Sequence, residues 1–142
     1  MKNIIIKLLA AQKAFPLIKK EDSNPFFKSK YAGLPSVLEV VLPILQKNGL
    51  LLTQHPITSG ERIGVKTAII DEESGESFES EFTMTLAKND PQGAGSAITY
   101  ARRYALISIL GLNVDDDDDG NVASAKTTKL TKNQIEDNGM PF

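Results

Sequence analysis

The stretch SFESEFTMTLAKNDPQGAGSAITYARRYALISIL, residues 77–110, joins a segment whose side chains alternate to a segment with the spacing of a helix. Apolar and polar residues alternate over residues 77–87, which is typical of a strand with one packed face and one solvated face. The face expected to be packed carries Phe78, Ser80, Phe82, Met84 and Leu86. Residues 89–95 have the composition of a loop, and a helix is expected from about Ser96 to Leu110, with Gly111 as its stop. This stretch therefore predicts a sheet strand followed by a helix.

The predicted helix 96–110 has small residues along one line, which lets a helix approach a sheet closely. These residues are Ala97, Ala101, Ala105 and Ser108. Tyr100, Arg103 and Tyr104 group on a second flank of the helix, and Arg102 points in a third direction. The helix thus combines a packing line with a flank of cations and aromatic rings.

Upstream segments supply two further strands and two helices. Strand-like residues run from Leu50 to Pro56 and from Arg62 to Asp71, and the turn-forming sequences TSGE and EESGE follow them. An amphipathic first helix is predicted by the spacing of Ile4, Ile5, Leu8, Leu9, Gln12 and Phe15. A second helix begins near Pro35 and stops at Asn48-Gly49, and its buried face is formed by Val37, Leu38, Val41, Leu42 and Leu45. We expect an α+β fold in which a three-stranded antiparallel sheet, preceded by two helices, has helices packed on one face.

Charge is distributed unevenly between the body of the chain and its end. Residues 1–110 hold 13 Lys and Arg against 11 Asp and Glu, whereas residues 111–142 hold 3 against 7. We therefore expect a core domain over residues 1–113 and an acidic, flexible tail over residues 114–142. A mildly basic body with an acidic tail is common in proteins that bind a polyanion, and the alternative is a domain with a solvating tail. The chain has no cysteine, which excludes disulfides and thiolate metal sites, and no apolar run long enough to span a bilayer.

Two clusters combine positive charge with aromatic rings, a combination that holds single-stranded nucleic acid by its phosphates and its bases. The first lies on helix 96–110 and contains Tyr100, Arg102, Arg103 and Tyr104. The second contains Lys28, Lys30 and Tyr31, next to Phe26 and Phe27. Lys66 on the second strand and Lys88 after the third strand are expected to line the same groove. The alternative for the first cluster is structural, with Tyr104 in the core and one arginine paired to Glu39, Glu79 or Glu81.

The run DPQGAGSAITYARRYALISILGL and the following DDDDDGN resemble the signature of the Erf (essential recombination function) family of phage single-strand annealing proteins. The matching positions are Gly95, Ser96, Thr99, Tyr100, Arg102, Arg103, Tyr104, Leu106 and residues 117–121. Upstream, NPFFKSKYAGLPSVLEVVLPILQKNGLLLTQ is similar to the first block of the same family. Together the two blocks cover about residues 10–121.

The resemblance implies ATP-independent binding and annealing of complementary single-stranded DNA in phage-type homologous recombination. It also implies ring or filament homo-oligomers, a contact role for Ser96, a β-β-β-α core like that of the Rad-group annealing proteins, and a location in the cytoplasm of a bacterial host. Annealing breaks no covalent bond, so we expect neither a catalytic residue nor a cofactor. The alternative is a recombination mediator that binds single strands without annealing them.

Three further features have residue types that occur in phosphate, catalytic or metal sites. The GAG sequence at residues 93–95 is expected to present backbone amides to a DNA phosphate, but no G-x-x-x-x-G-K-[ST] motif for nucleotide hydrolysis occurs. His55 has no evident companion for a metal site or a catalytic triad and is expected near the surface. Asp115 to Asp119 match only the first half of an EF-hand loop, because Lys126 stands where the bidentate Glu is required.

The aspartate run is expected to keep the tail away from phosphates or to pair with basic residues of a neighbouring protomer. A loose divalent-cation site and a solvated charge run are the alternatives. A metal-dependent nuclease is the third possible function, although it requires carboxylates from several rigid elements rather than one run.

The last residues, IEDNGMPF, resemble the tip of bacterial single-stranded-DNA-binding proteins, in which acidic residues precede an apolar residue, Pro and Phe. This predicts that Met140, Pro141 and Phe142 bind host replication or repair proteins. Asn138-Gly139 departs from the pattern, since acidic residues are usual there, and a chance ending is the alternative.

Overall fold

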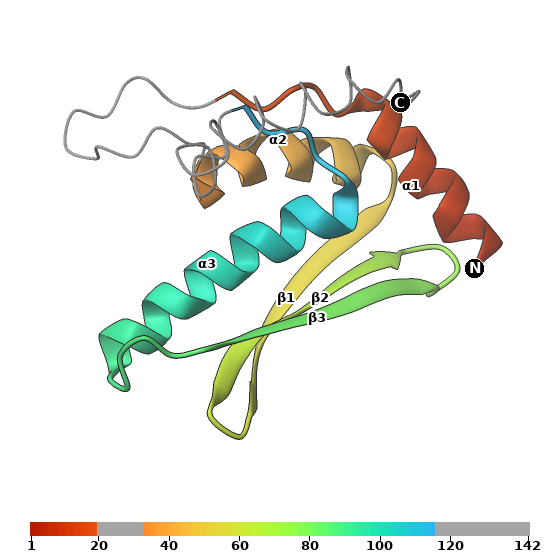
Figure 1. Ribbon diagram of the computed structural model, residues 1–142. Coiled ribbons are helices and arrows are strands. Elements are labelled where there is room, and N and C mark those ends of the chain that lie inside the picture. The colour runs from red at the N-terminus through yellow and green to blue at the C-terminus, as the bar shows by residue number, and fades with distance from the viewer. Residues whose placement is uncertain (20–32, 116–142) are drawn as a thin grey trace, which may run out of the picture.

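The computed structural model describes residues 1–19 and 33–115, which form three helices and one sheet (Figure 1). In chain order the elements are α1 (Lys2–Ala14), α2 (Leu34–Lys47), β1 (Leu50–Ser59), β2 (Arg62–Asp71), β3 (Ser77–Thr85) and α3 (Pro91–Leu110). The order of two helices, three strands and one helix confirms the predicted α+β fold.

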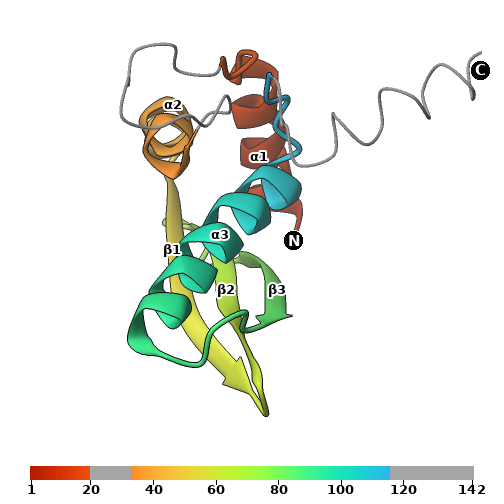
Figure 2. The same cartoon turned by 60° about the vertical axis from the view of Figure 1, so that its left-hand side comes forward.

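The sheet is a simple antiparallel meander with the order β1-β2-β3. Ser59 pairs with Arg62 across a two-residue turn, and Gly60 adopts a φ of 61° that a left-handed turn position requires. β1 continues past the expected end at Pro56 because β1 is an edge strand, where a proline without an N–H group interrupts no ladder bond. The β1–β2 hairpin extends past the helices at its tip (Figures 1 and 2).

α3 lies across one face of the sheet, as Figures 1 and 2 show from two sides. Ala97, Ala101 and Ala105 are buried on the side of α3 that meets the sheet, and Ala101 and Ala105 pack with Val65 of β2. This confirms the predicted packing line for the three alanines. Ser108 is exposed, so its assignment to the same line was wrong.

A larger core forms where α1 and α2 meet the end of the sheet at which β1 begins (Figure 1). Its fully buried side chains include Ile4, Val37, Val41, Leu45, Ile69 and Leu106. On α1 the buried positions are Ile4 and Ala11, whereas Ile5 and Leu9 remain 54% and 50% exposed. The prediction that Ile5 and Leu9 face the core was therefore wrong, because α1 buries only a narrow line of residues.

α3 begins five residues earlier than expected, so residues 91–95 of the predicted loop 89–95 are helical. Asp90 is the N-cap, and its Oδ1 accepts a hydrogen bond from the Gly93 N–H at 2.6 Å. Pro91 follows at the first helical position, where its missing N–H costs nothing. The Asp-Pro pair is thus a helix start rather than part of a turn.

The segments that follow α1 and α3 lie side by side. Ile18 and Val114 form a parallel bridge, in which the Ile18 N–H donates to Asn113 O at 2.9 Å and the Asp115 N–H donates to Ile18 O at 2.7 Å. Main-chain pairing therefore reaches two residues past the expected domain boundary at 113. None of the helices in the described part of the chain is long and apolar enough to cross a membrane.

Candidate nucleic-acid interface

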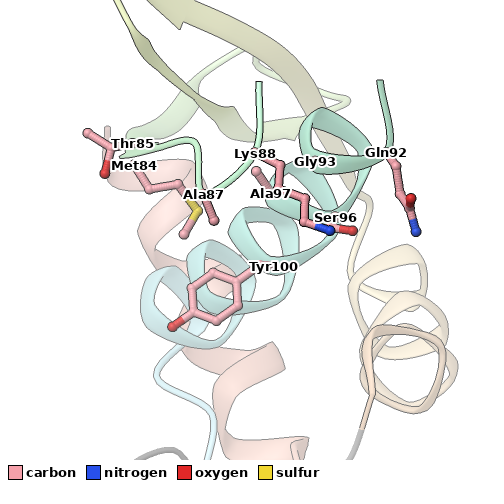
Figure 3. A pocket seen from close by; sticks show the side chains of 9 residues that line it. All are labelled: Met84, Thr85, Ala87, Lys88, Gln92, Gly93, Ser96, Ala97 and Tyr100. Carbon is pink, nitrogen blue, oxygen red and sulfur yellow. The ribbon is translucent and has the colours of Figure 1, made fainter. Parts of the chain in front are cut away.

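A pocket of about 360 Å³ lies between the end of β3 and the first turns of α3 (Figure 3). It is lined by Met84, Thr85, Ala87, Lys88, Gln92, Gly93, Ser96, Ala97 and Tyr100. Three of the residues predicted from the sequence to contact nucleic acid, Lys88, Ser96 and Tyr100, meet here. They come from two segments that the chain brings together when it turns from β3 into α3.

The lining divides into an apolar part and a polar rim. Met84, Ala87 and Ala97 provide aliphatic surface beside the Tyr100 ring, and Lys88 and Ser96 are exposed at the rim. In Figure 3 the Lys88 side chain extends toward Ser96, and Tyr100 lies at the other end of the group. A small apolar pocket with a few polar groups and one cation is suited to a planar ring that carries a nearby negative charge.

Tyr100 is supported from behind by a second aromatic ring. The ring centroids of Tyr100 and Tyr104 lie 4.3 Å apart with an interplanar angle of 35°. The guanidinium carbon of Arg103 lies 5.1 Å from the centroid of the Tyr104 ring, within the distance of a cation–π interaction. Tyr100 is 42% exposed, whereas Arg103 is only 4% exposed. Arg103, Tyr104 and Tyr100 therefore form a row of contacting side chains that runs from a buried cation to an exposed ring.

The two arginines have different environments, which the sequence alone did not resolve. Arg103 is buried as described above, whereas Arg102 is half-buried. Arg102 follows Tyr100 by two residues, which is about 200° around a helix, so the two side chains occupy opposite flanks of α3. The main-chain oxygen of Arg102 accepts a hydrogen bond at 3.0 Å from Nε2 of Gln54, which also donates to Thr67 Oγ1 at 3.0 Å. Gln54 on β1 thereby fixes the position of α3 over the sheet.

Lys66 is separated from these residues by the sheet. In the strand register Lys66 stands opposite Glu81, and its neighbours in sequence, Val65 and Thr67, point to the face that α3 covers. Its Nζ forms an ion pair with Glu79 at 3.1 Å, which lowers the pKa of the Glu79 carboxyl. The expectation that Lys66 lines a common groove with Lys88 and α3 was therefore wrong, because a strand residue next to a buried position points to the opposite face.

Several predicted positions fall outside the described residues. Lys28, Lys30 and Tyr31, with Phe26 and Phe27, belong to residues 20–32, and the tip residues Met140, Pro141 and Phe142 belong to residues 116–142. The aspartate run is described only at Asp115. Their predicted contacts stay predictions.

The remaining candidates from the sequence do not form a site in the described residues. The Gly93 N–H, which was expected to hold a phosphate, donates to the carboxylate of Asp90, a negative charge at the same helix end. His55 is exposed on β1, as expected. Within residues 1–19 and 33–115, no group of three or more His, Cys, Asp or Glu side chains is placed to hold a metal ion.

Sequence reasoning missed part of the pocket. Met84 and Thr85 were assigned to the strand and Gln92 to the loop, and none was connected with Tyr100. The Asp-Pro start of α3 was the available signal, because it places Gln92 in the same helix as Ser96 and Tyr100. The contribution of Met84 depends on how β3 turns into α3, which no local pattern reveals.

Comparison with known proteins identifies the family. The chain is 31% identical over 124 residues to the essential recombination function protein of Salmonella phage P22, an alignment that covers 78% of this chain and 60% of that protein. The chain thus spans about 60% of the length of this relative. No solved structure matches the chain significantly, so the likeness of the core to Rad-group annealing proteins stays a prediction. The profile of the ERF superfamily matches residues 4–139, and the chain therefore belongs to this family.

Proposed function

We propose that this protein binds single-stranded DNA and anneals complementary strands in phage-type homologous recombination, without ATP. Membership of the ERF superfamily and the name of the P22 relative support a role in recombination. The observation that carries the proposal for this chain is that Lys88, Ser96 and Tyr100 line one exposed pocket beside α3. We place the function in the cytoplasm of the bacterial host, where recombining phage DNA is found.

α3 is the surface that suits a DNA backbone. Residues 91–110 contain two arginines and no acidic residue. Lys88 lies at the pocket beside Ser96, and Arg102 lies further along α3 on the flank opposite Tyr100. A strand that crosses α3 would meet both cations, with uncharged Ser96 and Thr99 between them.

The opposite face of the sheet is less suitable for phosphates. It carries Glu79 and Glu81 on the edge strand β3, and the nearby Lys66 is already paired with Glu79. These carboxylates face outward and would repel a phosphate chain, because like charges repel one another. We therefore assign DNA contact to the α3 side.

Annealing requires contacts rather than covalent chemistry, so the proposal assigns no catalytic residue and no cofactor. Lysine and arginine side chains hold the phosphates, and counterion release makes the affinity fall as salt increases. Aromatic stacking holds bases without reading their identity, which leaves pairing to the complementary strand.

The test is the pairing rate of two dye-labelled complementary oligonucleotides, measured in EDTA and without nucleotide. We expect rapid pairing by the wild type and pairing at least several-fold slower in Lys88→Gln/Arg102→Gln. The double variant should also reduce the slope of log affinity against log salt by about 0.7 for each phosphate that the protein no longer neutralises. Arg103 is not changed, because it is buried and its replacement would disturb the fold.

Lys47→Gln is the matched control, since Lys47 is an exposed lysine at the end of α2, away from the pocket. Equally slow pairing in the control and in the double variant would contradict the assigned surface. Binding without faster pairing would favour the mediator alternative. Strand degradation that requires Mg²⁺ and disappears when the aspartates 115–119 become asparagines would favour the nuclease.

We also propose that protomers associate along the strand, because the described part of one protomer offers few phosphate contacts and several protomers multiply them. The exposed apolar residues Ile5, Ile6 and Leu9 of α1 offer a surface for this association. Ile5→Ser/Leu9→Ser should reduce the sedimentation coefficient at high protein concentration. An unchanged coefficient would exclude this surface.

For the C-terminal residues we keep the proposal that Met140, Pro141 and Phe142 recruit host replication or repair proteins. Deletion of these three residues should abolish binding to a host protein that recognises such tips and should spare annealing. Retained binding after deletion would contradict the proposal.

A further inference from the structure

The geometry points to a specific ligand for the pocket between β3 and α3: we propose that it takes one nucleobase turned out of the stack of a bound single strand, with Tyr100 as the stacking surface. This proposal rests on the proposed function, because the strand must first be bound. It goes further by assigning a base-binding subsite, which supplies one anchored base for each protomer.

Tyr100 has one face that is available to a base. Tyr104, one turn later in α3, covers one side of the ring at a centroid distance of 4.3 Å. The other residues of α3 that line the pocket all precede Tyr100 and therefore lie on its other side: Gln92, Gly93, Ser96 and Ala97. Tyr100 thus has Tyr104 on one side and the pocket lining on the other, and Figure 3 shows the Tyr100 ring beside that lining.

The support behind Tyr100 makes the ring a rigid platform. Tyr104 is half-buried, and Arg103, which is buried, lies against its ring at 5.1 Å. A ring that is already held in place loses little rotamer freedom when a base stacks on it, so more of the stacking energy remains for binding. Tyr104 is in this view a positioning residue for Tyr100.

The pocket fits one base together with its phosphate. Its volume of about 360 Å³ is at the small end of the range found for small-molecule sites, ~300–1,000 Å³. Met84 and Ala97 contribute apolar side chains to the lining, and Gln92 and Thr85 contribute polar side chains. Lys88 at the rim is placed for the phosphate that follows. A side chain from a second copy of this protein is the competing occupant, but it would leave this rim cation without a function.

A base bound in the pocket changes which bases of the strand are available for pairing. A base held in the pocket cannot pair, whereas the bases between two pockets remain available to the complementary strand. The pocket would therefore anchor the strand at intervals and release the anchored base when pairing reaches it.

The experiment uses photo-crosslinking of the full-length protein to a single-stranded oligonucleotide that carries 5-iodouracil, followed by mass spectrometry of the peptides. We expect an adduct on Tyr100 with the single strand, and a much weaker adduct with the same oligonucleotide in a duplex. The protein contains no Trp, so quenching of tyrosine fluorescence gives a second readout of stacking. The absence of an adduct on Tyr100 would overturn the proposal.

Two variants and a base-free strand measure the stacking contribution. Tyr100→Leu should weaken binding of oligo-dT by roughly 5- to 100-fold, and Tyr100→Phe, which keeps the ring, should bind within about twofold of wild type. On an abasic oligonucleotide of equal length, wild type and Tyr100→Leu should bind equally. Equal weakening by Tyr100→Leu on both strands would overturn the proposal, because phosphate contacts alone would then explain the weaker binding.

Phe78→Leu is the matched control, since Phe78 is 38% exposed and lies at the far end of β3 from the pocket. Circular dichroism checks folding. If Tyr100→Leu does not fold, Ser96→Leu tests the same point, because it fills the pocket from an exposed helical position.

A change in the sedimentation coefficient by Tyr100→Leu with unchanged DNA affinity would overturn the base site in favour of a contact between protomers. Wild type that binds neither strand would instead refute the proposed function itself.

Discussion

Two glycines in the first turns of α3 have opposite surroundings, although only one residue separates them. A Cβ atom at Gly93 would lie 2.1 Å from the main-chain oxygen of Lys88, far inside van der Waals contact. A Cβ atom at Gly95 would meet no atom within 4 Å. Gly93 is therefore required where the segment after β3 folds back on the helix, whereas Gly95 only raises the entropy that the helix loses on folding.

This contrast predicts opposite effects of the same substitution. Gly93→Ala should lower the free energy of unfolding by about 1–3 kcal/mol, because the backbone of the Lys88 turn must move. Gly95→Ala should raise it by about 0.5–1 kcal/mol, since alanine is the better helix former. Urea unfolding of both variants measures the difference. Destabilisation by Gly95→Ala to the extent of Gly93→Ala would contradict the close approach at Gly93.

At the scale of elements, the attachment of α1 to the sheet depends on a small group of charges. Asp71, at the end of β2, is fully buried, and its carboxylate accepts hydrogen bonds from Lys7 Nζ at 2.6 Å and from Ser74 Oγ at 2.7 Å. Lys7 also pairs with Glu73 at 2.9 Å, and the terminal amine of Met1 pairs with Glu76 at 2.7 Å. α1 is thus fastened to the β2–β3 turn at two points along its length.

These contacts predict how stability depends on pH. The hydrogen bond from Lys7, followed by that from Ser74, lowers the pKa of Asp71 from 3.8 to about 2. A carboxyl with a lowered pKa stabilises the fold fully above its ordinary pKa, and the contribution disappears as the pH falls from about 4 to about 2. Lys7 shifts in the other direction: its pKa is raised above 10.5, so its contribution persists through neutral pH and disappears only above that value.

Asp71→Asn should therefore lower stability at pH 7 and flatten the decline in stability between pH 4 and pH 2. The midpoint of urea unfolding, measured at a series of pH values, checks this. Glu61→Gln, in the exposed turn between β1 and β2, is the control and should keep the steep acid dependence. A profile for Asp71→Asn as steep as that of wild type would show that other carboxylates cause the acid transition.

At the scale of the whole molecule, the excess of negative charge is concentrated in residues 116–142. Residues 1–115 carry 13 Lys and Arg and 12 Asp and Glu, whereas residues 116–142 carry 3 and 6. Removal of residues 116–142 changes the net charge from −2 to +1. The packed core closes at Asp115, through its hydrogen bond to Ile18.

A chain of residues 1–115 should therefore fold and should bind single-stranded DNA more tightly than the full chain at low salt. The two affinities should converge as salt is raised, because charges that do not touch the DNA are screened over about 10 Å at 0.1 M salt. Fluorescence anisotropy with a labelled oligonucleotide at several salt concentrations measures both. A lower affinity of the shortened chain at low salt would mean that residues 116–142 contribute contacts rather than repulsion.

Much of the fold could be predicted because its elements carry strong local signals. The alternation over residues 77–87 and the line of alanines on α3 each reflect a repeat that burial on one side imposes, and glycine-containing sequences mark the turns. The alternation overstated two details, because β3 ends at Thr85 and Phe78, expected on the packed face, is 38% exposed. Tyr100 and Lys88 were singled out because their types suit a nucleic acid, and the structure places both in one pocket, while their contact with DNA stays a prediction. Errors arose where a local signal was misread, as for the Asp-Pro start of α3, or where burial depends on neighbours, as for Ile5 and Leu9.

The amino-acid pattern alone was sufficient to predict the order of helices and strands and to identify the family, because periodicity and motifs are properties of consecutive residues. It was not sufficient to predict which charged residues lie on the same surface. Lys66 and Lys88 were expected together, yet strand register turns Lys66 to the opposite face, toward Glu79. The packing of α3 over β2 and β3 buries Arg103, leaves Arg102 half-buried, and closes a pocket between Met84 and Tyr100. These relations join residues that are distant along the chain, and they exist only once the helix has packed on the sheet.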